Sequence, residues 1–226
     1  MIAIAHRGLW FPDPKTQNTT GAAESAVKAG CGVEIDVFAA GNLLCVGHTV
    51  PRKIGDSNVS AWAYDGGTLP ADYFFPILKD APLIAWNIKN NGCAPLIIEA
   101  IERLGAQDRS FVFDQELIGE SYAGSACPIL LRASDREPIG DSLKQRQAIG
   151  IWLDAFESDW VTSDVIKTVH DAGKKAYVVS PELHGRRLDL SLWFDWADAD
   201  GICTDYPHLL QALFNGKDLY PREPWW

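Results

Sequence analysis

The chain has 226 residues, of which 47% are hydrophobic and 22% are charged, a composition typical of one globular domain with a sizeable core. Thirty acidic side chains against twenty basic ones give a net charge of −10, which disfavours nucleic acid as a partner. No apolar run reaches the roughly 20 residues of a membrane helix, and the apolar start is too short for a signal peptide. We therefore expect a single domain over residues 1–226, located in the cytoplasm and without stable membrane insertion.

Short apolar runs rich in β-branched residues alternate with helical patterns along the chain, which is typical of βα units and a parallel sheet. Helices are predicted over 21–29, 94–104 and 163–172, each followed by a glycine that suits a helix C-terminus. About eight strands are expected, the number that closes a (β/α)8 TIM barrel, an α/β fold. The predicted strands are Ile2–Ala5, Val33–Val37, Leu83–Ile88, Phe111–Phe113, Pro128–Leu131, Gly150–Leu153, Ala176–Val179 and Gly201–Cys203.

The connection between the second and third predicted strands, residues 38–82, is too long for an ordinary βα loop. It contains a further predicted strand, Leu43–Val46. Because loops at the carboxyl ends of barrel strands carry the chemistry, we expect this insertion to lie over the functional site. Five separated cysteines without CxxC or CxH spacing argue against a disulfide framework and a zinc site, and are expected in the core.

Polar residues stand at the carboxyl ends of consecutive predicted strands, where side chains reach the mouth of a barrel. Glu34 and Asp36 are two apart and so share one face of a strand. Paired carboxylates call for a hard divalent cation, Mg2+ or Ca2+, to which Asn87 would add an amide oxygen. An inward salt bridge to Arg7 and Lys89 without any metal is an equally good interpretation of the acidic pair alone.

Arg7 and Lys89 also provide positive charge suited to a phosphoryl group. His6 and His48 exchange protons near neutral pH, as acid–base cleavage of a phosphodiester requires. A single histidine is more often a structural hydrogen-bonding group, so the prediction depends on the combination.

The order of these segments resembles the glycerophosphodiester phosphodiesterase family, within the phosphatidylinositol-phospholipase-C-like superfamily. The matching segments span nearly the whole chain. They are residues 5–8 (AHRG), 17–19 (QNT), 29–30 (AG), 33–37 (VEIDV), 46–48 (VGH), 87–89 (NIK), 170–174 (HDAGK) and 199–207 (ADGICTDYP).

The resemblance implies a hydrolase that cleaves glycerophosphodiesters to glycerol phosphate and an alcohol with a divalent cation, Mg2+ or Ca2+. It implies an acid–base pair, metal ligands and phosphate-binding cations. Carried over by position, these are His6 and His48 as the acid–base pair, Glu34 and Asp36 with Asn87 as metal ligands, and Arg7 and Lys89, with Gln17 and Asn18, at the phosphate.

The sequence also departs from the family pattern. Gln17 and Asn87 stand where the family usually has glutamates, and Thr49 follows His48 where the family has aspartate. Loss of two carboxylates at or beside the metal is expected to weaken cation binding. Two alternatives to the hydrolase remain: a cyclising lyase or diesterase for a sugar-phosphate or lipid-headgroup diester, and a catalytically silent phosphodiester-binding protein.

Nine tryptophans exceed what packing requires. Trp152 shares a strand face with Asp154 and is predicted to form a wall of the substrate site, with Trp10 as a weaker candidate. Trp86 is expected in the core. Arg132 and Glu182 reach the mouth on this interpretation, although a salt bridge across the rim explains them equally well.

Overall fold

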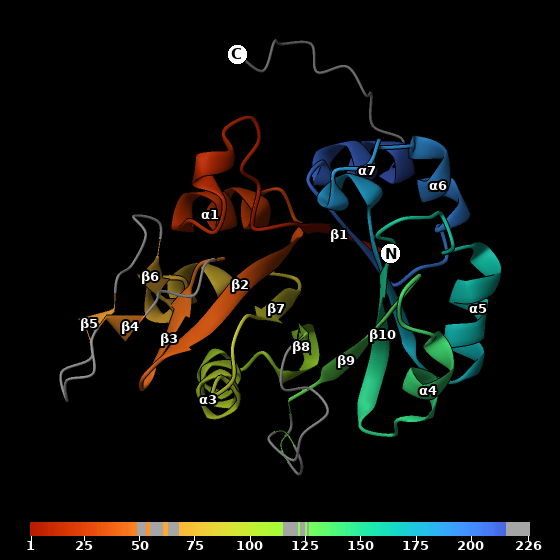
Figure 1. Cartoon of the computed structure of the whole chain (residues 1–226). Helices are drawn as coiled ribbons and strands as arrows, with labels where there is room; N and C mark the ends of the chain where they lie inside the picture. Colours follow the sequence, from red (N-terminus) through yellow and green to blue (C-terminus); the bar gives the residue numbers. More distant parts are fainter. Residues whose placement is uncertain are drawn as a thin grey trace.

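A computed structural model describes residues 1–48, 53–54, 61–62, 68–114, 122, 125 and 127–215. Eight parallel strands form a closed barrel in the order β1-β12-β11-β10-β9-β8-β7-β2, and pairing of β1 with β2 completes the circle (Figure 1). The predicted (β/α)8 fold is therefore confirmed. The barrel strands are β1 (Ile2–Ala5), β2 (Gly32–Ala40), β7 (Ile84–Ile88), β8 (Ser110–Asp114), β9 (Ile129–Ser134), β10 (Ala148–Asp154), β11 (Lys175–Val179) and β12 (Gly201–Thr204).

Helices cover the outside of the barrel, and their bounds follow local signals in the sequence (Figure 1). The Thr19 hydroxyl accepts a hydrogen bond from Ala22 N–H and so begins the first helix one residue earlier than predicted. Gly105, with φ of 55°, follows the helix over 94–104 and ends it at the predicted residue. The helices are α1 (Thr20–Lys28), α2 (Phe75–Leu78), α3 (Ala94–Leu104), α4 (Ile139–Lys144), α5 (Ser163–Asp171), α6 (Leu190–Asp195) and α7 (Pro207–Asn215), with 3-10 turns at Pro14–Thr16, Ala71–Tyr73, Gln107–Arg109 and Pro181–His184.

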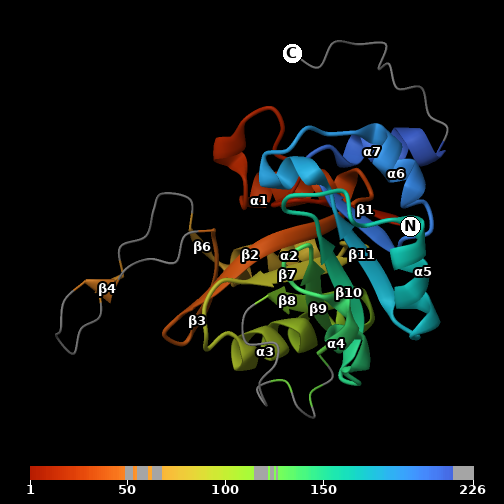
Figure 2. The ribbon, with the colours of Figure 1, turned by 45° about the vertical axis from the view of Figure 1, so that its right-hand side comes forward.

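The predicted insertion between the second and third barrel strands is present and begins as a β-hairpin. Strand β2 continues to Ala40, beyond the predicted end, because β3 (Leu43–Val46) pairs with it in antiparallel register. Strand β6 (Leu69–Pro70) pairs with β3, while β4 (Lys53–Ile54) and β5 (Ala61–Trp62) pair with each other. Strands β3 and β6 of the insertion lie on the side of the barrel opposite α5 and α6 (Figure 2).

The core contains Trp86 and the five cysteines, as predicted, together with two further tryptophans. Trp86, Trp193 and Trp196 are fully buried, and all five cysteines are buried with free thiols. Trp225 and Trp226 lie outside the described residues. No helix within the described ranges is long and apolar enough to cross a bilayer.

A close approach between the β1–α1 loop and α1 requires glycine at position 8. Gly8 has φ of +84°, and a Cβ atom there would lie 2.6 Å from the backbone carbon of Ala22. Gly8 thus lets the chain turn sharply after β1, which directs the two preceding residues, His6 and Arg7, toward the barrel mouth.

Candidate active site

A cavity of about 290 Å³ opens at the carboxyl ends of the barrel strands. All eight strands, or the residues directly after them, contribute to its lining. One wall of the cavity is formed by His6, Arg7, Glu34, His48, Asn87 and Lys89. The other part of the lining includes Asp114, Arg132, Trp152, Asp154 and His184. Residues far apart in the sequence therefore meet in one cavity at the functional end of the fold.

The backbone is held in the left-handed region at three non-glycine residues around this mouth. These are Arg7 with φ of 57°, Asn18 with φ of 55° and Asp114 with φ of 83°. Such conformations cost about 1–3 kcal/mol each and persist where the surroundings over-determine them. At Arg7 the turn directs the backbone N–H to Oε2 of Glu34 at 2.9 Å.

Asp36 lies at the centre of a buried charge network. Its Oδ2 accepts a hydrogen bond from Asn18 Nδ2 at 2.9 Å and forms an ion pair with Arg7 Nε at 2.8 Å. Lys89 Nζ lies 2.9 Å from Oδ1. Burial opposes ionisation of this fully buried carboxyl, but Lys89 and Arg7 outweigh burial and hold the pKa of Asp36 below its ordinary value. Gln17 Oε1 accepts a hydrogen bond from Arg7 Nη1 at 3.0 Å and further fixes the guanidinium.

Glu34 is 1% exposed, and its pKa is shifted in the direction opposite to that of Asp36. Burial, followed by repulsion from Asp36, raises the pKa of Glu34 above its ordinary value. Its oxygens accept hydrogen bonds from Arg7 N–H and from Asn87 Nδ2, the latter at 3.0 Å. The neighbouring strands place Asn87 directly beside Asp36 in the parallel register.

His6 forms a histidine–carboxylate pair, with Nδ1 at 2.7 Å from Oδ1 of Asp205. The loop after β12 supplies this aspartate, and Glu182 fixes the loop by accepting hydrogen bonds from Asp205 N–H and the Thr204 hydroxyl. Glu182 does not line the cavity itself, and its hydrogen bonds hold the loop that carries Asp205 in place.

His48 follows β3 and reaches the same cavity from the insertion. Burial, followed by the positive charge of Arg7, lowers the pKa of His48 below its ordinary value. Thr49, which follows it, lies outside the described residues.

The structure divides the predicted site residues into two groups. The residues that line the cavity are His6, Arg7, Glu34, His48, Asn87, Lys89 and Trp152. The predicted residues that do not line it are Gln17, Asn18, Asp36 and Trp10. Gln17, Asn18 and Asp36 instead hold Arg7 and one another in place. Trp152 is only 4% exposed and stacks on Phe113 at 4.1 Å between ring centroids, so only a small part of its ring faces the cavity.

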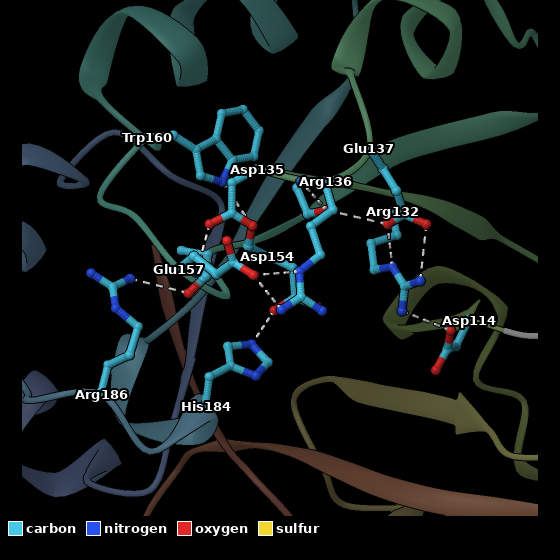
Figure 3. A network of polar contacts seen from close by, with 12 residues as sticks. Asp114, Arg132, Asp135, Arg136, Glu137, Asp154, Glu157, Trp160, His184 and Arg186 are labelled. Carbon is cyan, nitrogen blue, oxygen red and sulfur yellow. Dashed lines mark hydrogen bonds and ion pairs between the residues drawn. The ribbon is translucent and has the colours of Figure 1, made fainter.

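The second part of the lining was not predicted as a functional unit. Arg132 is bound by Asp114 at 3.1 Å and by Glu137 at 2.6 Å, and His184 Nε2 is hydrogen-bonded to Oδ1 of Asp154 (Figure 3). Burial raises the pKa of Asp114 above its ordinary value. Asp114 and Asp154 each end a barrel strand, and this is the sequence signal that could have identified them.

The donor atoms present fit a weakly held divalent cation. Asn87 Oδ1 is a buried oxygen with no hydrogen-bond partner in the described part of the chain, and Glu34 adds carboxylate oxygens beside it. However, Asp36 is already neutralised by Arg7 and Lys89, and no three His, Cys, Asp or Glu side chains among the described residues are grouped to hold a metal ion. A cation would therefore bind to few protein oxygens and need further ligands from the substrate.

Comparison with solved structures finds the same architecture in several proteins. A candidate glycerophosphodiester phosphodiesterase from Galdieria sulphuraria superposes with a TM-score of 0.71 at 16% sequence identity, over 95% of this chain and 97% of that one. The glycerophosphodiester phosphodiesterase from Agrobacterium tumefaciens gives a TM-score of 0.66 at 18% identity, over 94% and 100% of the two chains. The likeness establishes the shared fold.

A third similar structure is the glycerophosphoryl diester phosphodiesterase domain of an uncharacterized protein from Mycobacterium tuberculosis. It gives a TM-score of 0.64 at 12% identity, over 94% of this chain and 98% of the other. No family model and no curated protein sequence matches the chain.

Proposed function

We propose that this chain is a phosphoric diester hydrolase of the glycerophosphodiester phosphodiesterase type. The observation that carries the proposal is the convergence of His6, His48, Arg7 and Lys89 on one cavity at the carboxyl end of the barrel. The cavity is small, and a net charge of −10 on the chain disfavours anionic polymers, so the substrate is a small glycerophosphodiester. Its products are a phosphomonoester, glycerol phosphate, and an alcohol.

Arg7 and Lys89 bind the phosphoryl oxygens in this proposal and oppose the negative charge that develops on them. Both side chains line the cavity, and their bonds to buried Asp36 fix their positions before substrate arrives. Pre-positioned charges need little reorganisation during the reaction, which is the main source of such stabilisation.

The two histidines divide the proton transfers. His48 is neutral near pH 7 because its pKa is lowered, so it accepts the proton of a substrate hydroxyl on the carbon next to the esterified one. As that oxygen bonds to phosphorus, the bond to the leaving alcohol breaks and His6 gives the alcohol its proton. Asp205 compensates the charge of protonated His6. Water then opens the cyclic phosphodiester with the proton transfers reversed, which yields the phosphomonoester.

Glu34 and Asn87 would hold a divalent cation, Mg2+ or Ca2+, whereas Asp36, also predicted as a ligand, is paired with Arg7 and Lys89. When bound, the cation supplies additional positive charge at the phosphoryl oxygens. The substrate would complete its coordination, since the protein offers few oxygens.

The test is release of phosphomonoester from a panel of glycerophosphodiesters, with and without chelator. Turnover that falls on chelation supports the full proposal. Accumulation of a cyclic product identifies a lyase instead, and tight binding without turnover identifies a silent binding protein. The cytoplasmic location and the lack of nucleic-acid binding stay predictions from the sequence.

A further inference from the structure

The cavity extends beyond the phosphate-binding residues to a second wall that the proposed chemistry does not use. This wall contains Asp114, Arg132, Asp154 and His184, and we call it the distal wall. Its side chains come from the ends of β8, β9 and β10 and from the 3-10 turn after β11 (Figure 3).

The guanidinium of the distal wall is already engaged by neighbouring carboxylates. Arg132 places Nε and Nη2 on Glu137 at 2.6 and 3.0 Å, and Nη1 on Asp114 at 3.1 Å. The carboxylates of Glu137 and Asp114 therefore neutralise the positive charge of Arg132. A second anionic group on a ligand would also meet Asp114 and Asp154, which repel it.

Asp154 presents an acceptor oxygen to the cavity. Its side chain is 9% exposed and lines the cavity, and Oδ1 is hydrogen-bonded to Nε2 of His184. Within the described residues, Oδ2 of Asp154 accepts no hydrogen bond. A cavity-lining carboxylate oxygen with no donor from the protein favours a ligand that donates a hydrogen bond.

His184 fixes the direction of this carboxylate. Its ring packs against Phe156 with centroids 4.4 Å apart, and Figure 3 shows Nε2 facing Asp154 while the other ring nitrogen faces away from it. The Asp154 backbone is held as well, because its carbonyl accepts a hydrogen bond from Trp160 Nε1 at 2.7 Å. Asp154 is thus a rigid acceptor, which suits recognition of a defined group.

The aromatic rings nearby do not form a cage for a quaternary ammonium group. The Phe156 ring already contacts His184 and has the guanidinium of Arg136 at 4.9 Å, while Trp152 is 4% exposed against Phe113. No open aromatic face is therefore offered to a choline-like cation by these rings.

We propose that Asp154, oriented by His184, is a specificity-determining residue that selects substrates with hydroxyl groups beyond the phosphoryl group, namely esters of a polyol. The inference rests on the proposed function for the phosphate half of the site. Hydroxyl groups donate to Asp154 Oδ2 without adding charge, and an alkyl chain of the same length leaves that oxygen unpaired. Asp154 acts in binding and not in the chemical step.

Calorimetric titration with phosphomonoesters of equal carbon length tests this without requiring turnover. The probes are glycerol 3-phosphate, propyl phosphate and 3-aminopropyl phosphate. We expect the protein to bind glycerol 3-phosphate at least tenfold more tightly than propyl phosphate. Asp154→Asn should reduce that ratio below threefold while leaving the Kd of propyl phosphate within twofold.

Two further variants separate recognition from general damage. His184→Gln keeps a donor for Asp154 and is expected to retain most of the preference. Glu157→Gln alters an exposed carboxylate after β10, bound to Arg136 at 2.6 Å and outside the cavity lining, and should retain all of it.

The proposal is overturned if Asp154→Asn keeps the full preference, or if 3-aminopropyl phosphate binds most tightly and loses affinity in Asp154→Asn. The second result would assign the distal wall to an amine. Failure of the proposed hydrolase is recognised separately, as absence of turnover on every diester, and leaves the binding ratio intact. Turnover with no preference for glycerol 3-phosphate over propyl phosphate overturns the selection by Asp154 alone.

Discussion

Lys89 Nζ lies 2.9 Å from Oδ1 of Asp36, a carboxylate with no solvent exposure. Arg7 binds the other oxygen of the same group, so one buried aspartate holds both cations that face the cavity. The pairing compensates a buried negative charge and fixes two positive ones at the mouth. Stability and phosphate binding are therefore coupled at this point.

Removing one partner of this network is expected to destabilise the fold. Lys89→Met leaves Asp36 with Arg7 alone and should lower the free energy of unfolding by about 3 kcal/mol, measured by urea denaturation. Lys144→Met removes an exposed pair with Asp141 and should cost less than about 1 kcal/mol. Equal small changes in both variants would show that the buried network contributes little.

Both histidines of the cavity are expected to be essential for turnover. His6→Asn and His48→Asn should each lower kcat by about 10²- to 10⁴-fold, because each removes one of two proton transfers. Steady-state assays on a glycerophosphodiester measure this. His170→Asn, which removes an exposed pair with Asp200 at 3.0 Å, serves as the control and should stay active. Near-full activity of both cavity variants would contradict the mechanism.

The pKa of His48 is expected to lie below its ordinary value of about 6.5. Burial and the charge of Arg7 disfavour the protonated form of His48, so the ring in the folded protein stays neutral down to a lower pH. As the pH falls, this histidine is therefore protonated in the unfolded chain before it is protonated in the folded protein. NMR titration of the ring resonances should show this, and Arg7→Gln should raise the midpoint. A midpoint above the ordinary value in the unaltered protein would contradict the assignment of His48 as the base.

Cation affinity is expected to be limited by the amide at position 87. Asn87→Glu replaces a buried unpartnered oxygen with a carboxylate beside Glu34 and should tighten Mg2+ or Ca2+ binding at least tenfold, which corresponds to about 1.4 kcal/mol. Calorimetric titration of the metal alone measures this. Asn42→Glu, on the exposed turn after β2, adds the same charge elsewhere and should have little effect. Equal effects of the two variants would place the cation outside this set of oxygens.

The turn after β1 is expected to tolerate no side chain. Gly8→Ala would place Cβ 2.6 Å from the backbone of Ala22, whereas Gly30→Ala, also at positive φ, meets nothing within 4 Å. Both variants incur the cost of a left-handed conformation, about 1–2 kcal/mol, so the difference between them isolates the clash. Thermal unfolding should show the greater loss in Gly8→Ala, and equal losses would show that the loop moves aside.

Much of the barrel could be predicted because its signals are local. Each barrel strand is a short apolar run, and helices such as α3 end at a glycine that adopts positive φ. The polar residues at strand ends could also be placed at one mouth, since parallel strands share an edge. The extension of β2 to Ala40 was not predicted, because it depends on pairing with β3 across a turn.

The partners of each polar group depended on contacts across the barrel. His6 and Asp205 are 199 residues apart, and Asp154 and His184 are 30 apart on different elements, so no spacing pattern links them. The sequence by itself determined the number of strands, the end of the barrel that carries polar residues and the residue types available there. Only the tertiary structure decided that Arg7 and Lys89 share Asp36 and that a histidine–carboxylate pair faces them, because closure of the barrel brings distant strand ends to within hydrogen-bonding distance.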